Sequence, residues 1–179
     1  MPVHIRLASG RDLPDILRIT DCAIEESQRA FLSPEQIAAC RQFMGVDTQL
    51  LKDGTYFCAT IDGQVAGVGG WSWRRTLYGG EHADALLDPT PLDPAHEPAR
   101  IRAMYTDPLF ARRGVGRAIV EAAERAACAA GFRAAELMST LAGEPLYRRC
   151  GYEAVEAPVA WRAGAVAVPL IRMRKPLAR

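Results

Sequence analysis

The first part of the chain changes from strand-like to helical spacing of its apolar residues. Residues 3–8 favour a short strand, and the run from Ser9 to Pro14 then has the polar caps and the early proline of a helix start. Beyond it, apolar residues recur at steps of three and four, which predicts an amphipathic helix with one face against a core. The inward positions are Leu13, Ile16, Leu17, Thr20 and Ile24. A second predicted helix is capped by Ser33, and its inward positions are Ile37, Cys40 and Met44.

Two strand-like runs follow at residues 55–61 and 64–71. Asp62-Gly63 between them is a preferred two-residue turn, so this pattern predicts an antiparallel hairpin. Residues 74–98 contain four prolines and two adjacent glycines without a regular period. We therefore expect a long surface loop there.

Residues 100–140 predict a strand, a glycine-containing loop, a helix and a second strand. The strands are residues 100–106 and 134–140, and the helix runs from Gly114 to a C-terminal cap at Gly131. Its inward positions are Val115, Ala118, Ile119, Ala122, Ala123 and Ala126. On its outer face, Glu121 and Arg125 have the spacing of an ion pair. A strand–helix–strand unit usually joins two parallel neighbours by a right-handed crossover.

The last part of the chain completes an α/β sheet. We expect a short helix near residues 145–150 and two final strands at about 151–157 and 166–174.

Length and charge exclude several classes of protein. A chain of 179 residues suits one domain, so we treat residues 1–179 as a single domain. Twenty-two basic and 21 acidic residues leave a formal charge of +1, which gives no basic field for nucleic acid or for an anionic membrane. There is neither a run of about 18 apolar residues nor a signal-peptide pattern. We expect a cytoplasmic protein that binds neither nucleic acid nor membranes.

The cysteines and histidines do not have the spacing of a metal site. None of the five cysteines lies within five residues of another, and His4, His82 and His96 are scattered. We expect reduced thiols and no metal.

The most informative residues surround the predicted helix start at Gly114. A helix that begins there leaves several N–H groups unpaired and directs the positive end of its dipole forward. Gly114 and Gly116 let the main chain approach phosphate oxygens, and Arg112, Arg113 and Arg117 can add charged hydrogen bonds. The loop therefore suits a pyrophosphate, with a tight turn or a solvated basic turn as the alternatives. A Walker A loop needs Gly-Lys-Ser/Thr and a dinucleotide fingerprint needs a third glycine, so both fit poorly.

Two motifs occur in a fixed order around this helix. The first is Asp107-Pro108 followed by residues 111–118, Ala-Arg-Arg-Gly-Val-Gly-Arg-Ala, and the second is residues 146–152, Leu-Tyr-Arg-Arg-Cys-Gly-Tyr. At this spacing they resemble the GNAT superfamily of acetyl-CoA-dependent N-acetyltransferases, whose signatures are Gln/Arg-x-x-Gly-x-Gly/Ala and Leu-Tyr-x-x-x-Gly-Phe. Ala111 stands where the family has Gln or Arg, and Thr140 stands where Asn is frequent. The resemblance covers about residues 3–174 in element order.

The resemblance implies a fold and a set of binding residues. The fold is a single GNAT-like α/β (α+β) domain, with a mixed, mostly antiparallel sheet of about six or seven strands that is splayed between its two central parallel strands. Acetyl-CoA is the implied cosubstrate, with its pantetheine arm along the strand that ends at Thr106, and no metal is implied. The implied coenzyme-binding residues are Met104, Tyr105, Thr106, Arg112, Arg113, Gly114, Val115, Gly116 and Arg117.

The resemblance also implies direct acetyl transfer to a primary amine in a ternary complex. A main-chain N–H near Tyr105 would polarise the thioester carbonyl, and Tyr147 would protonate the departing thiolate as the general acid. Reference pKa values of about 10 for tyrosine and about 8.5 for a thiol make that transfer uphill by about 2 kcal/mol. Without the motif, Tyr147 reads as a half-buried structural aromatic. A coenzyme A-binding sensor without turnover and a nucleotide-binding protein are the alternative functions.

The acceptor side is left open by the sequence. The acceptor is a small-molecule amine or a protein amine, and a homodimer is compatible with the sequence. Trp71 and Trp73 suit sheet packing or an acceptor-site wall. An acidic segment could attract a cationic amine or simply keep a loop soluble; it contains Glu81, Asp84, Asp88, Asp93 and Glu97. The candidate general bases are Glu25, Glu26, Glu81 and Asp84.

Overall fold

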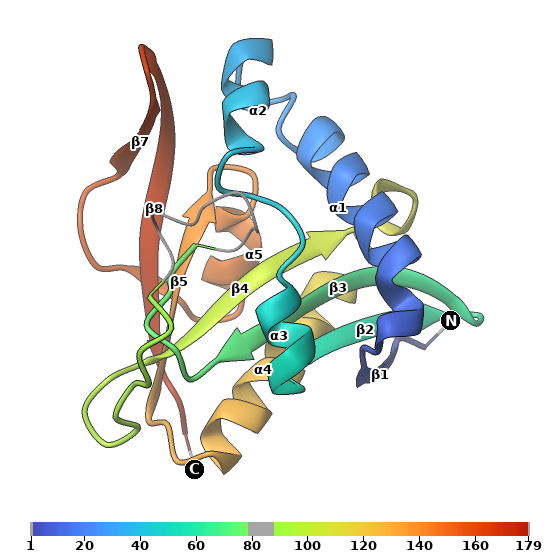
Figure 1. Cartoon of the computed structure of the whole chain (residues 1–179), viewed down its shortest axis with the longest axis vertical. Helices are drawn as coiled ribbons and strands as arrows, with labels where there is room; N and C mark the ends of the chain where they lie inside the picture. The colour runs from blue at the N-terminus through green and yellow to red at the C-terminus, as the bar shows by residue number, and fades with distance from the viewer. Residues whose placement is uncertain (1, 79–87, 179) are drawn as a thin grey trace.

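In the part of the chain that the structure describes, eight strands form one mixed sheet (Figure 1). The structure is a computed structural model that describes residues 2–78 and 88–178. The strands lie in the order β1-β2-β3-β4-β5-β8-β6, and β7 pairs with β8. Their bounds are β1 His4–Leu7, β2 Tyr56–Ile61, β3 Gln64–Ser72, β4 Ala99–Thr106, β5 Ala134–Thr140, β6 Glu153–Ala154, β7 Val159–Ala163 and β8 Val166–Pro176.

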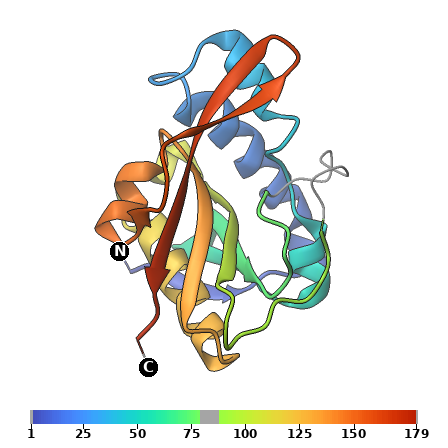
Figure 2. The same ribbon diagram turned by 90° about the vertical axis from the view of Figure 1, so that its left-hand side faces the viewer.

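Helices cover both faces of this sheet (Figure 2). On one face, here called the α1 face, lie α1 (Leu13–Ser27), α2 (Pro34–Cys40) and α3 (Thr48–Asp53). On the other, the α4 face, lie α4 (Val115–Ala129) and α5 (Glu144–Arg149). The mixed α/β fold expected from the sequence is confirmed, with one strand more than the expected six or seven.

The predicted start of α1 is confirmed, whereas the prediction of its inward face is partly wrong. The Ser9 N–H and hydroxyl donate to Asp12 Oδ2 at 2.8 and 3.0 Å, and Pro14 lies in the first turn. The buried positions are Ile16, Ile19, Thr20, Ala23 and Ile24. Leu17 was expected inside and is 52% exposed. Each residue turns the helix by about 100°, so Leu17 points away from the direction of its buried neighbour Ile16.

The inward face of α4 is corrected in the same way. Ala118 and Ala126 are half-buried, while Val120 and Ala127 are fully covered. We expected Glu121 to pair with Arg125. It pairs instead with Arg117, one turn earlier along the helix, with Arg117 Nε 2.8 Å from Glu121 Oε1. The predicted C-terminal cap is confirmed: Gly131 follows the helix with φ +95°.

The predicted hairpin is confirmed as β2 and β3. Asp62 and Gly63 form its turn with φ values of +50° and +79°, which suits this residue pair. Both faces of β3 are covered by helices, so every residue after Gln64 is buried.

Two elements were not expected from the sequence. The six-residue α3 is capped by Asp47, whose side chain accepts the Leu50 N–H at 3.2 Å, and it ends at Gly54 with φ +68°. Near the C-terminus, the expected strand at 151–157 is reduced to Glu153–Ala154, and the separate strand β7 forms a hairpin with β8. The letters of β7, Val-Ala-Trp-Arg-Ala, give a weak strand signal because alanine and arginine do not favour strands.

The parallel neighbours β4 and β5 separate soon after they meet. They pair only at Ala99 with Ala135 and at Arg100 with Glu136. At that point Glu136 is buried and forms ion pairs with Arg100 and, at 3.0 Å, with Arg172 of β8. Beyond it the two strands diverge, and we call this opening the splay. The parallel crossover expected from the sequence is confirmed.

Part of the expected 74–98 loop is held firmly at its base. Thr76 and Asp88 exchange main-chain and hydroxyl hydrogen bonds of 2.9 Å, and Arg74 makes a bidentate pair with Asp53 of α3 at 2.7 and 2.9 Å. These contacts fix Leu77 and Tyr78 beside the sheet. Across residues 2–78 and 88–178, no helix has both the length and the apolar character needed to cross a membrane.

Candidate functional site

A cavity of about 230 Å³ occupies the splay. Residues 101–106 of β4 and 138–140 of β5 form its sides. The α4 face contributes Gly116, Leu146 and Tyr147, and the α1 face contributes residues 27–28, 43–44 and 77–78. The cavity is therefore lined from both faces of the sheet, at the carboxyl ends of two parallel strands.

The glycine loop lies beside this cavity at the start of α4. Arg112 and Gly114 have positive φ values of +64° and +82°, and the first helical hydrogen bond runs from Ala118 N to Gly114 O at 3.0 Å. The N–H groups of residues 115–117 therefore have no acceptor within the helix. They point forward together with the positive end of the helix dipole, which suits an anion.

Close packing fixes this helix start against the sheet and α5. The side chain of Val115 is buried against β2 and β3 rather than turned to the loop. A Cβ atom at Gly116 would lie 2.8 Å from Leu146 Cδ2 and 3.6 Å from Thr106 Oγ1. A larger residue at 116 would therefore push the Leu146 side chain of α5 away from the helix start.

The three arginines of the loop are exposed and do not line the cavity. The guanidinium of Arg113 lies 5.4 Å from the ring centroid of Phe110, and Arg117 pairs with Glu121. These side chains can reach an anion on the surface in front of the helix. They contribute nothing to the walls of the splay.

The three β4 residues named from the sequence line the cavity next to a bulge. Ala103 has φ +54°, and the pairing of β4 with β3 is irregular at this point. The hydroxyl of Tyr56 donates to Ala103 O at 3.3 Å, and the hydroxyl of Tyr105 accepts the Gly45 N–H at 2.9 Å. Met104, Tyr105 and Thr106 follow the bulge. The bulge turns part of the β4 main chain out of the regular ladder, beside the cavity.

Tyr147 lies on α5 at the α4-face wall of the cavity. It is 8% exposed and packs edge-on against Tyr152, with ring centroids 5.9 Å apart. Burial raises the pKa of Tyr147 above its usual value, so the phenol stays protonated at neutral pH. A protonated phenol beside a buried cavity can donate a proton or a hydrogen bond there.

The α1-face wall was not anticipated from the sequence. Its Phe43 ring packs against two other rings, with its centroid 4.7 Å from that of Trp161 of β7 and 6.2 Å from that of Tyr78. Phe43 lies in the turn between α2 and α3, and Tyr78 lies in an irregular loop. No local period marks such positions, so the only available signal was their aromatic character.

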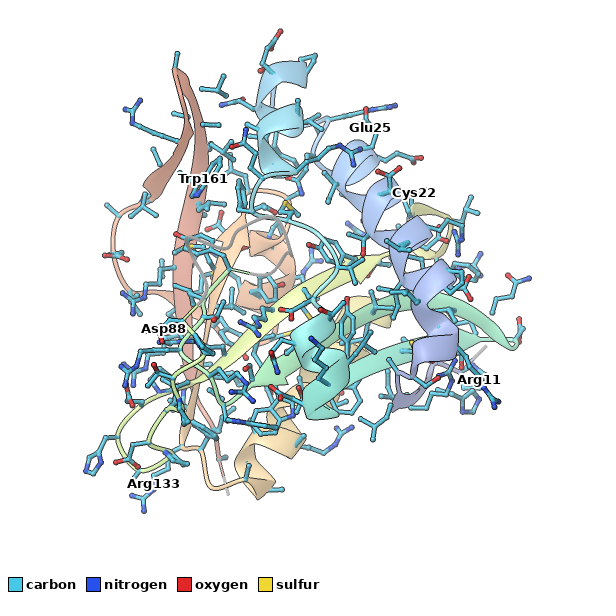
Figure 3. All side chains as sticks on the ribbon, viewed as in Figure 1. Arg11, Cys22, Glu25, Asp88, Arg133 and Trp161 are labelled. Carbon is cyan, nitrogen blue, oxygen red and sulfur yellow. The ribbon has the colours of Figure 1, made fainter. Side chains whose placement is uncertain are left out.

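Among the residues that the structure describes, no carboxylate lines the cavity. Glu25 faces outward from α1 (Figure 3). It pairs with Arg29 and Arg41 at 3.2 and 3.5 Å, and Glu26 is exposed. The two other candidate bases, Glu81 and Asp84, lie outside the described residues, as does His82. The charged side chain on the lining is Arg102, which is buried and paired with Asp47 at 2.9 Å.

The remaining acidic and aromatic candidates lie elsewhere. Glu97 pairs with Arg75, and Asp93 lies 2.7 Å from His96. Trp71 and Trp73 pack against each other with ring centroids 5.6 Å apart, in the core of the α4 face. Within residues 2–78 and 88–178, no group of three or more His, Cys, Asp or Glu side chains is arranged to hold a metal ion.

Comparison with known proteins identifies a family to which the sequence is similar. The pattern of the acetyltransferase (GNAT) domain matches residues 52–154, more than half of the chain. No curated protein sequence matches significantly.

Solved structures share the fold at low sequence identity. A GCN5-related N-acetyltransferase from Rhodopseudomonas palustris is 18% identical with a TM-score of 0.70, covering 99% of this chain and 97% of that one. PaiA N-acetyltransferase from Thermoplasma acidophilum, solved in complex with coenzyme A, is 13% identical with a TM-score of 0.64 over 98% and 99%. A ribosomal-protein-alanine N-acetyltransferase from Brucella melitensis is 18% identical with a TM-score of 0.65 over 97% and 99%.

Proposed function

The chain belongs to the acetyltransferase (GNAT) domain family, and on this basis we propose that it transfers an acetyl group from acetyl-CoA to a primary amine. The observation that supports this most directly is the cavity in the splay, with the unpaired N–H groups of α4 at its side. A small molecule or a protein could supply the amine.

The residues present fit a coenzyme A molecule. The N–H groups of residues 115–117 would hold the pyrophosphate, and Arg112, Arg113 and Arg117 would add charge from the surface. The cavity is slightly below the range of about 300–1,000 Å³ that is usual for whole-ligand pockets, which suits the narrow pantetheine arm. Met104, Tyr105 and Thr106 would line that arm from β4, where the strand has lost its parallel neighbour.

The chemistry of the transfer would rest on polarisation and proton donation by this chain. The β4 main chain near Tyr105 would donate a hydrogen bond to the thioester carbonyl, and Tyr147 would give a proton to the departing thiolate. Burial raises the pKa of Tyr147 and so makes this donation harder than the reference values suggest. The same burial would raise the pKa of a thiol in the cavity, which offsets part of the difference.

Release of free thiol from acetyl-CoA tests this proposal. We expect the purified protein to bind coenzyme A in calorimetry and to release thiol when an amine is supplied from a panel of hydroxylamine, benzylamine, spermidine, lysine and a peptide with an N-terminal alanine. Binding without turnover across the panel would favour a sensor instead. Competition by ATP or NAD at an affinity comparable to that of coenzyme A would favour a nucleotide-binding protein.

A further inference from the structure

Gln28 lies where α1 ends and reaches toward β5 across the splay. It is 4% exposed, it lines the cavity, and its Nε2 donates to Thr140 Oγ1 at 3.4 Å. Its Oε1 is also buried and has no hydrogen-bond partner among the described residues. A buried carbonyl oxygen without a partner is unfavourable, so one at a cavity wall indicates a ligand that supplies the missing donor.

The neighbours of Gln28 hold one end of its side-chain amide. Thr140 Oγ1 also accepts the Gly143 N–H at 3.2 Å, so this hydroxyl oxygen receives two donors. In this arrangement Nε2 lies toward Thr140, and Oε1 is buried without a partner among the described residues. At the other end, the main-chain oxygen of Gln28 accepts the N–H groups of Phe31 and Leu32, each at 2.9 Å. The backbone that positions the side chain therefore does not depend on the side chain itself.

Thr140, the partner of Gln28, lies on the same stretch of wall as Tyr147. Gly143 connects them, because a Cβ atom there would be 3.6 Å from Thr140 Oγ1 and 3.1 Å from Tyr147 Cε2. On its other side Gln28 neighbours the α1-face wall with Phe43 and Tyr78. Gln28 is thus placed between that wall and the tyrosine to which we give the proton-donating role.

Resting on the proposed function, we infer that Gln28 Oε1 binds the acceptor amine by accepting a hydrogen bond from its nucleophilic nitrogen. A primary amine has two N–H bonds and one lone pair, so one fixed N–H···O bond directs the lone pair. A neutral amide oxygen also holds the reactive, uncharged amine without the strong preference for ammonium that a carboxylate would add.

The hydrogen bond strengthens as the reaction proceeds. The C–N bond forms and the C–S bond breaks, and the nitrogen gains positive charge before it loses a proton to solvent. The thiolate takes up one proton, so acetyl-CoA and the amine give an amide and free coenzyme A. Because the bond is strongest at the charged nitrogen, its loss should lower turnover as well as acceptor binding.

Hydroxylamine is a suitable probe because it is small, largely uncharged at neutral pH, and gives a hydroxamate product that forms a coloured complex with ferric iron. We expect Gln28→Leu to lower kcat/KM for hydroxylamine by about 10- to 100-fold, the range for a hydrogen bond to a charged group, at unchanged coenzyme A affinity. Gln28→Glu retains an accepting oxygen and should restore most of the activity. The matched control is Gln42→Leu, the same change at an exposed glutamine outside the cavity, which should behave as the wild type.

Three results would overturn this role. They are wild-type kinetics in Gln28→Leu, an equal loss of coenzyme A affinity in that variant, and a Gln28→Glu variant as impaired as the leucine variant. If the wild-type protein binds coenzyme A and acetylates neither hydroxylamine nor any other amine of the panel, the proposed function itself fails and this inference fails with it.

Discussion

The two sides of the cavity are built by different means. On the proposed coenzyme side, the surface consists mainly of main chain: Gly114 adopts a left-handed conformation, Gly116 packs against Leu146, and the first N–H groups of α4 point outward. On the proposed acceptor side, the surface consists of side chains from three separate segments, among them Gln28 and Phe43. A helix start with two glycines is a local feature and is visible as a motif. A wall assembled from distant side chains is not.

The strongest test of this contrast is Gly114→Val. The residue has φ +82° and no heavy atom within 4 Å of its would-be Cβ, so valine distorts the loop without a clash in the core. Loss of the aligned N–H groups removes several charged hydrogen bonds of about 1.5–3 kcal/mol each, so coenzyme A affinity should fall on the order of 1,000-fold in calorimetry.

Gly164→Val is the matched control for this substitution. Gly164 also has a positive φ, +60°, and open space around it, in the turn between β7 and β8. Its replacement should impose similar backbone strain and leave coenzyme A affinity unchanged. Equal losses in both variants would show that strain, rather than the loop, causes the effect.

Tyr147→Phe should have the next largest effect, on the rate rather than on binding. Removing a general acid costs about 100-fold or more in turnover, whereas coenzyme A affinity should stay within about threefold. Tyr152→Phe is the same change in the ring that packs against Tyr147, and it should leave turnover unchanged because Tyr152 does not line the cavity.

The pH dependence of turnover is a further test of the role of Tyr147. Because burial raises the pKa of Tyr147, the phenol stays protonated throughout the neutral range. Turnover should therefore rise with pH as the amine loses its proton, without an alkaline decline below about pH 10, the usual tyrosine value. A decline near pH 8 that disappears in Tyr147→Phe would contradict a strongly buried acid.

Arg113→Ala should have the smallest effect. Its guanidinium is exposed and rests on the ring of Phe110, so it acts on phosphate from the solvent side. We expect coenzyme A affinity to fall by about three- to tenfold in low salt and less in high salt, since surface charges are screened. A loss as large as that of Gly114→Val would mean that side chains, rather than main chain, build the coenzyme side.

Most of the fold followed from local patterns. The hairpin turn at Asp62-Gly63 and the helix start at Gly114 are each set by a few adjacent residues, and both lie where expected. The α3 helix was missed because six residues carry too little periodicity, although Asp47 and Gly54 are recognisable caps. Leu17 was misplaced because an apolar residue next to a stripe resembles a member of it.

The residues of the site also fall into those that local sequence predicts and those that it does not. The sequence named Met104 to Thr106, Gly116 and Tyr147, and the structure brings them together around one cavity. It did not name Gln28, whose importance depends on a missing partner for one atom, because a sequence shows neither hydrogen bonds nor their absence. The acceptor-side neighbours Phe43 and Tyr78 meet only through tertiary packing.

The early parting of β4 and β5 has a thermodynamic consequence for the whole molecule. Past Arg100 and Glu136, the facing edges of these strands lack the ladder that a regular parallel pair would have. A molecule with amide groups of its own can complete this ladder only in the folded state. By mass action, such a molecule at 100 times its dissociation constant stabilises the fold by about 2.7 kcal/mol. The melting temperature should thus rise with the concentration of the proposed cosubstrate, and the protein should resist proteolysis best where that concentration is high.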